Sequence, residues 1–214
     1  NIFYLWSYMR SISEKIKPDM RILLTGKTGT GKTWLGIHEI QPLFPRTIII
    51  DLKPEYNPEP GDIVCYGFNE FARIYKGLQE LKQYRVIFKF ADYETNENLI
   101  FNEICKLVYH MKELLFVVEE AHFVTNPHFI PHWFKKIITA GRSKNIGCYF
   151  TSVRPGLLNG LLINQSSVFL IGNLGDRNDS KALANYVPGV DQAFTLRPRQ
   201  FLLSDGFSSS LIHS

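Results

Sequence analysis

The chain has 214 residues, of which 45% are hydrophobic and 21% are charged. Such values are typical of a folded domain and exclude a disordered chain, a collagen-like repeat and a long coiled coil. The formal net charge of +4 permits an anionic partner but does not establish one. The cysteines Cys65, Cys105 and Cys148 form no CxxC pair, so we expect neither a disulfide framework nor a zinc ribbon.

The N-terminal segment is apolar but short. Its first six residues lack the basic start and the small-residue cleavage site of a signal peptide. No apolar run approaches the roughly 18–20 residues that cross a bilayer. We therefore expect an intracellular protein without a transmembrane span. Residues 1–20 are expected to form an extension that packs on the domain or on a neighbouring subunit.

Short apolar runs alternate with helical patterns along the chain. Near-continuous apolar runs suit strands that are buried on both faces of a sheet. Apolar residues at spacings of three and four predict helices over 71–81 and 100–111. The prolines within 53–61 predict a loop. The expected strands are 21–25, 47–51, 85–90, 114–118, 147–151 and 167–171. This alternation predicts an α/β fold with a mostly parallel sheet flanked by helices.

The C-terminal region carries the pattern of an antiparallel hairpin. Residues 193–196 and 200–203 are mainly apolar and flank Arg197-Pro198-Arg199. We therefore expect a single domain over residues 21–206, closed by this hairpin and followed by a tail at 207–214.

A glycine-rich segment follows the first predicted strand and opens a predicted helix over 32–39. It is Gly26-Lys27-Thr28-Gly29-Thr30-Gly31-Lys32-Thr33, which fits G-x-x-x-x-G-K-[ST] at every fixed position. Glycines let successive backbone N–H groups point at phosphate oxygens, and the helix adds its positive N-terminal end. In such a loop Lys32 reaches the β- and γ-phosphates and the Thr33 hydroxyl binds Mg²⁺. The segment predicts a nucleoside triphosphate site with ATP and Mg²⁺ as cofactors.

Two adjacent acids, Glu119 and Glu120, follow the predicted strand at 114–118. A P-loop needs an acid at the end of a neighbouring strand to hold Mg²⁺, and a base to activate the attacking water. We expect Glu119 to hold Mg²⁺ through water and Glu120 to act as the base. Solvated acids at the start of a helix are the simpler alternative, but the P-loop favours catalysis.

Three further segments carry motifs that can be compared with a known family. Residues 50–56 are I-D-L-K-P-E-Y, residues 140–143 are A-G-R-S before a strand, and residues 151–155 are T-S-V-R-P at the end of that strand. With the P-loop and the C-terminal hairpin, they resemble the HerA–FtsK superfamily of DNA-pumping ATPases, particularly its compact viral genome-packaging members. The resemblance extends over about residues 21–206 and implies a RecA-like P-loop NTPase fold.

The resemblance also implies roles for individual residues. Arg142 stands where the superfamily places an arginine finger that reaches the site of the next subunit. The sensor glutamine of the superfamily aligns with Val153, which has no polar group, so the expectation is either that Thr151 or Ser152 contacts the γ-phosphate instead or that the coupling is weaker. For Arg154 a finger and a surface ion pair are equally favoured.

The function implied by the resemblance is ATP-driven translocation of double-stranded DNA by a homo-oligomeric ring, in viral genome packaging into a capsid. DNA would be held through its phosphates, independently of sequence. A capsid or membrane vertex protein is the expected docking partner, and the host cytoplasm or the virion the expected location. Two alternatives stay open, namely a membrane-associated protein assembly or secretion ATPase and a small P-loop kinase.

Overall fold

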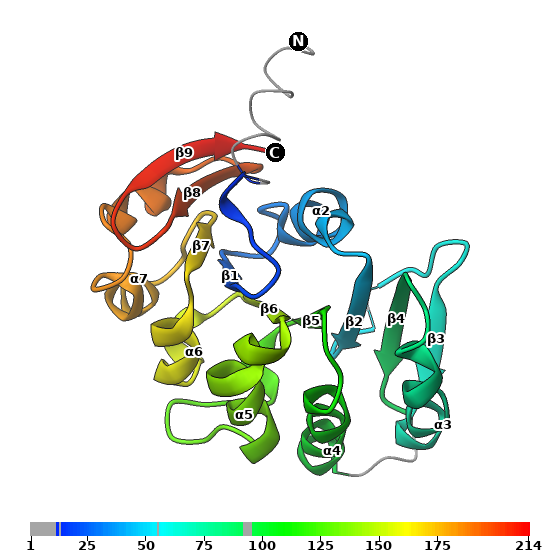
Figure 1. The fold of residues 1–214 in the computed structure, drawn as a ribbon. Helices are drawn as coiled ribbons and strands as arrows, with labels where there is room; N and C mark the ends of the chain where they lie inside the picture. The colour runs from blue at the N-terminus through cyan, green and yellow to red at the C-terminus, as the bar shows by residue number, and fades with distance from the viewer. Residues whose placement is uncertain (1–11, 13, 55, 92–95) are drawn as a thin grey trace.

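The computed structural model describes residues 12, 14–54, 56–91 and 96–214. Within this part of the chain, one nine-stranded sheet has the order β3-β4-β2-β5-β6-β1-β7-β8-β9 (Figure 1). Neighbours from β3 to β7 pair in parallel, whereas β7, β8 and β9 pair antiparallel. The strands are β1 Arg21–Thr25, β2 Arg46–Asp51, β3 Ile63–Tyr66, β4 Tyr84–Lys89, β5 Leu114–Val118, β6 Ile146–Ser152, β7 Val168–Ile171, β8 Gln200–Ser204 and β9 Ser209–His213. The predicted α/β class, with its mostly parallel sheet and C-terminal antiparallel strands, is confirmed.

Helices cover both faces of the sheet, with α3 to α6 on one side and α2 on the other (Figure 1). In β2, Ile48 and Ile50 pack with the first layer and Ile49 packs with the second. Burial on both faces explains why the central strands are near-continuous apolar runs. The α-helices are α2 Lys32–Leu35, α3 Phe68–Leu78, α4 Glu97–Tyr109, α5 His132–Ala140, α6 Gly160–Gln165 and α7 Arg177–Leu183.

Helix α4 shows how the sequence defines these layers. The Asn96 side chain accepts a backbone N–H bond of 3.0 Å in the first turn, which satisfies one orphan donor of the helix. Phe101, Ile104 and Val108 recur at three and four residues, and all are buried against the sheet. The helix predicted over 100–111 is therefore present, with its ends shifted toward the N-terminus.

The helix after the P-loop is shorter than expected. Only Lys32–Leu35 is α-helical, and a π-helical turn at Gly36–Ile40 and a 3₁₀ turn at Gln41–Leu43 continue it. At Gly36 an added Cβ would collide with the hydroxyl of Tyr149 on β6. The missing side chain thus lets the chain pass close to the sheet directly behind the P-loop. Other 3₁₀ turns lie at Ala121–Phe123, Gly141–Lys144, Pro155–Leu157 and Val190–Thr195.

The predicted C-terminal hairpin is wrong in its first strand. Residues 193–196 do not form a strand, since Val190–Thr195 is a 3₁₀ turn. The Asn173 side-chain amide donates to the carbonyls of Phe194 and Leu196, which removes these carbonyls from strand pairing. Instead β8 pairs with β9, which lies within the expected tail at 207–214. The sheet therefore extends beyond the expected domain boundary.

The segment that precedes the sheet contributes to the second layer. Ile12 is buried, and Ile16 and Met20 pack against the same cluster. The remainder of the expected N-terminal extension, residues 1–11 and 13, lies outside the described residues. Among the described helices, none is long and apolar enough to cross a membrane.

Candidate nucleotide-binding site

The P-loop leaves the carboxyl end of β1 and curls back over itself. Gly31 has φ 95°, a left-handed conformation that favours glycine, and directly precedes α2. The Lys32 ammonium donates to the carbonyls of Gly26 and Lys27 at 2.8 and 3.1 Å. The Thr30 hydroxyl donates to the same Lys27 carbonyl at 2.9 Å. These bonds hold the loop closed around its own lysine.

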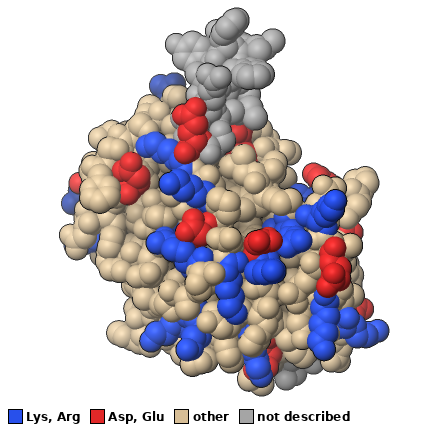
Figure 2. All heavy atoms as spheres, viewed as in Figure 1, with Lys and Arg blue, Asp and Glu red and all other residues tan. Residues whose placement is uncertain are grey.

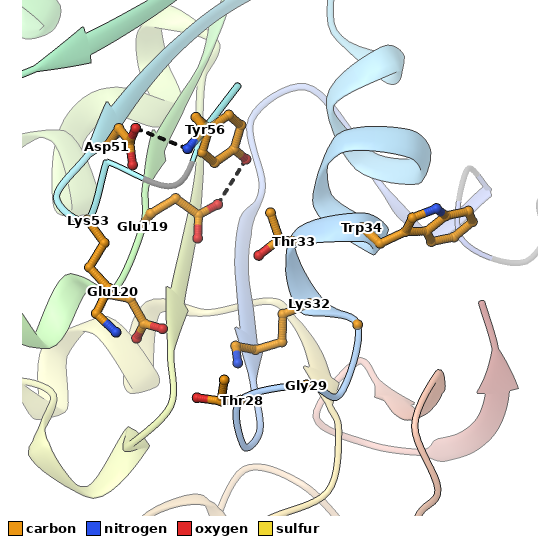
Figure 3. A pocket seen from close by; sticks show the side chains of 11 residues that line it. Thr28, Gly29, Lys32, Thr33, Trp34, Asp51, Lys53, Tyr56, Glu119 and Glu120 are labelled. Atoms are coloured by element: carbon orange, nitrogen blue, oxygen red, sulfur yellow. Dashed lines mark hydrogen bonds between the residues drawn. The ribbon is translucent and has the colours of Figure 1, made fainter. Parts of the chain in front are cut away.

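A cavity of about 280 Å³ opens above this loop (Figure 3). Of the predicted P-loop residues, Gly26, Lys27 and Thr30 shape the loop without lining the cavity. The lining residues are Thr28, Gly29, Gly31, Lys32, Thr33, Trp34, Asp51, Lys53, Tyr56, Glu119 and Glu120. The structure thus brings the core of the P-loop and both predicted acids to one cavity, although they are far apart in sequence.

Glu119 lies at the end of β5 in a chain of hydrogen bonds. Its carboxylate accepts from the Tyr56 hydroxyl at 3.0 Å and from the Thr151 hydroxyl at 2.6 Å. The Gln41 amide donates to the Tyr56 hydroxyl at 2.6 Å. Burial, helped by the nearby Glu120 carboxylate, raises the pKa of Glu119 to about 7, although the Thr151 and Tyr56 hydroxyl donors oppose the shift. A cation in the cavity would favour the charged carboxylate, as a magnesium site requires.

Glu120 is held in an unusual backbone conformation. Its φ of 51° is left-handed, which is strained for a residue with a side chain. Its carboxylate accepts from the Val153 backbone N–H at 3.0 Å and lies 3.3 Å from His122 Nδ1. Its own N–H donates to the Thr151 hydroxyl at 2.8 Å. Thr151 therefore contacts both acids.

The residues at the carboxyl end of β6 contact the two acids in a way that the sequence did not predict. The apolar Val153 side chain offers no polar group, but its backbone N–H contacts Glu120. Ser152 is fully buried and is not among the described residues that line the cavity. Its hydroxyl bonds with His122 Nδ1 at 3.1 Å and accepts the Arg154 N–H at 3.0 Å. Any influence of Ser152 on a phosphate would pass through His122 or Glu120.

The two arginine candidates lie beyond opposite ends of strand β6. Arg142 precedes β6, away from the carboxyl ends that carry the P-loop, and its side chain is 59% exposed beside Asp19. Within one chain it does not approach the cavity. Arg154 follows β6 and pairs with Asp176 and Asp179 at 3.1 and 3.2 Å.

Sequence reasoning assigned no site role to the loop after β2. Asp51 accepts from the Tyr56 backbone N–H at 3.2 Å and from the Lys89 ammonium at 2.8 Å. These contacts pin the loop, so that Lys53 and Tyr56 line the cavity with the acids (Figure 3). The position of this loop in the sheet could have indicated its role. Strand β2 pairs with β5, so the loops that follow the two strands begin at the same side of the sheet.

The fold and this cavity define a P-loop NTPase. No protein-family model matches the chain. The chain is 30% identical over 172 residues to the DNA packaging ATPase P9 of Enterobacteria phage PRD1, covering 78% of this chain and 70% of P9. It therefore belongs to the viral DNA packaging ATPase family represented by P9. The resemblance to viral genome-packaging ATPases noted in the sequence is confirmed.

The fold is also found in solved structures of other proteins, of which two are compared with this chain. The genome packaging NTPase B204 of Sulfolobus turreted icosahedral virus 2, in complex with ATP-γS, superposes with a TM-score of 0.72 at 17% identity, covering 93% of this chain and 98% of B204. VirB4 of Thermoanaerobacter pseudethanolicus gives a TM-score of 0.62 at 12% identity, covering 92% of each chain.

Proposed function

We propose that this protein is an ATP-hydrolysing motor that translocates double-stranded DNA during viral genome packaging. The similarity to a DNA packaging ATPase along 78% of the chain carries the proposal. A P-loop that shares a cavity with two buried acids supports ATP hydrolysis in particular.

The cavity suits a triphosphate with Mg²⁺. Backbone N–H groups of the P-loop would bind the phosphates, and Lys32 would exchange its carbonyl partners for the β- and γ-phosphate oxygens. The Thr33 hydroxyl and, through water, Glu119 would hold Mg²⁺, which would neutralise charge on the phosphates. Burial alone disfavours the charged form of the Glu119 carboxyl, and a bound cation would offset this cost. The buried carboxyl therefore fits a role beside Mg²⁺.

Glu120 is the proposed base. It would take a proton from the water that attacks the γ-phosphorus, and the bond to the ADP oxygen would break. The Val153 N–H and His122 hold its carboxylate in position. Burial lowers the pKa of His122, so its neutral ring is favoured beside Glu120.

The exposed Arg142 would complete the site of a neighbouring subunit in a homo-oligomeric ring. Basic side chains gather on the face seen in Figure 2, with acidic side chains between them. Basic groups of this kind would grip DNA phosphates without reading sequence. A capsid or membrane vertex protein would dock the ring, which would act inside the host cell or on the virion.

The test is the ATPase rate against protein concentration, with and without long double-stranded DNA, at low and moderate salt. The proposal predicts a steep concentration dependence and a salt-sensitive stimulation by DNA, both absent from Glu120→Gln. A flat rate that DNA does not change would contradict it and favour a protein-moving ATPase. A rate that rises only with a phosphate acceptor would favour a kinase.

A further inference from the structure

Trp34 lies at the side of the phosphate cavity toward which the nucleoside of a bound nucleotide would extend. It follows Thr33 directly, lines the cavity and is partly exposed. Its side chain points away from Glu119 and Glu120 (Figure 3). Glu119 and Glu120 would lie beside the γ-phosphate. The nucleoside end of the ligand would therefore extend to the other side of Thr33, toward the indole.

Arg199 covers this indole from the turn before β8. Its guanidinium carbon lies 4.6 Å from the centroid of a Trp34 ring. At Gly31 an added Cβ would lie 3.4 Å from Arg199 Cγ, so the arginine stem packs directly on the P-loop. The His38 ring contacts Trp34 at a centroid distance of 4.9 Å. The indole thus contacts Arg199 from a distant segment and, at a tilt of 42°, His38 from its own segment.

The backbone fixes Arg199 in this place. Its φ of 63° is left-handed. Its N–H donates to the Thr30 carbonyl of the P-loop at 2.9 Å, and its carbonyl accepts the Ser214 N–H at 2.8 Å. These bonds use no side-chain atom of Arg199. The Arg199 side chain is exposed, and among the described residues its contact with the Trp34 ring leaves the guanidinium accessible to a ligand.

We propose that Trp34 and Arg199 form the nucleoside subsite, where the base of the triphosphate stacks on the indole–guanidinium pair. This inference rests on the proposed function, since it assumes a triphosphate on the P-loop. Flat π-surfaces and guanidinium groups bind every base by its face. The subsite therefore supplies affinity with little choice of base, and ATP and GTP should bind within a few-fold of each other.

The experiment compares two probes that share the phosphate chain. A non-hydrolysable ATP analogue and inorganic tripolyphosphate are each titrated into the full chain with Mg²⁺ by calorimetry. Trp34→Ala should weaken binding of the ATP analogue about 5- to 150-fold, the range expected for losing one base stack. Binding of tripolyphosphate should change less than about twofold. Trp34→Phe should retain most of the affinity because it keeps an aromatic face.

Arg199→Gly tests the second half of the stack. Glycine adopts the left-handed φ without strain, so the backbone bond to Thr30 can persist while the guanidinium is lost. This variant should weaken the ATP analogue selectively, whereas Arg197→Ala in the same turn should not. Thermal unfolding of each variant reports whether the fold is kept.

Three outcomes overturn the inference. Equal losses for both probes would mean that Trp34 only supports the P-loop. Unchanged affinity for both probes would place the base elsewhere, and discrimination of more than about 10-fold between ATP and GTP in the wild type would contradict recognition by stacking. Failure of the proposed function is separate, since it would appear as absent DNA stimulation or as no triphosphate binding by the wild-type chain.

Discussion

Replacing Glu119 with glutamine should stabilise the protein in a pH-dependent manner while damaging its site. Burial raises the pKa of Glu119 from an ordinary value of 4.5 to about 7. The folded chain thus binds this proton more tightly than the unfolded chain, and stability is lost as pH rises between the two values. Glutamine carries no such charge and removes the loss.

The magnitude follows from the two pKa values. Each pH unit between them corresponds to about 1.4 kcal/mol, so the full difference is roughly 3.5 kcal/mol as an upper limit. The free energy of unfolding of Glu119→Gln minus that of the wild type should therefore rise between about pH 5 and pH 7.5. Above that range it should be constant. Changes in the hydrogen bonds to Tyr56 and Thr151 add an offset but no slope.

The assay is urea unfolding from pH 5 to pH 8.5, in EDTA and without nucleotide. Glu80→Gln is a matched control, because Glu80 is exposed on the surface. The free energy of unfolding of this variant minus that of the wild type should not rise between pH 5 and pH 7.5. If the free energy of unfolding of Glu119→Gln relative to the wild type does not change with pH, or falls as pH rises, burial does not raise the pKa of Glu119 as inferred.

Three further predictions concern neighbouring parts of the site. Tyr56→Phe should raise the Mg²⁺ concentration for half-maximal ATPase activity roughly 10-fold, because the hydroxyl that positions Glu119 is lost. An unchanged Mg²⁺ dependence would show that this hydrogen bond does not affect metal binding. Gly36→Ala should destabilise the fold by about 1–3 kcal/mol in urea unfolding, and Tyr149→Phe should relieve part of this cost; an equal cost in both backgrounds would contradict the steric cause. Arg142→Ala and Glu120→Gln subunits should each lack turnover alone and regain some in mixed rings, and no recovery in confirmed mixed rings would exclude action in trans.

The central strands and the P-loop were predictable because their signals are local. Strands buried on both faces are apolar throughout, and the phosphate loop has fixed spacing. The edge strands lack such signals. In β3, Ile63 and Val64 are only half-buried, and within β9 Ile212 alone is buried behind a serine-rich start. Such strands are defined by the neighbour they pair with rather than by their own composition.

The missed parts of the site depend on tertiary contacts. Tyr56 meets Glu119 across 63 residues of sequence, and only the pinned path of the loop after β2 brings them together. The Val153 position was judged by its side chain, but the structure uses its backbone N–H. A backbone contact leaves no trace in residue identity. The Arg199 contact with the P-loop similarly requires knowing how the C-terminal turn folds back.

Movement along DNA driven by ATP can be measured as the displacement of a third strand from a triplex. The duplex carries a labelled third strand far from the end where the protein loads. With ATP and Mg²⁺, the wild type should release the label, while Glu120→Gln, or the wild type with a non-hydrolysable analogue, should leave it bound. Rapid ATP hydrolysis by DNA-bound wild type, with the third strand still in place, would contradict the account.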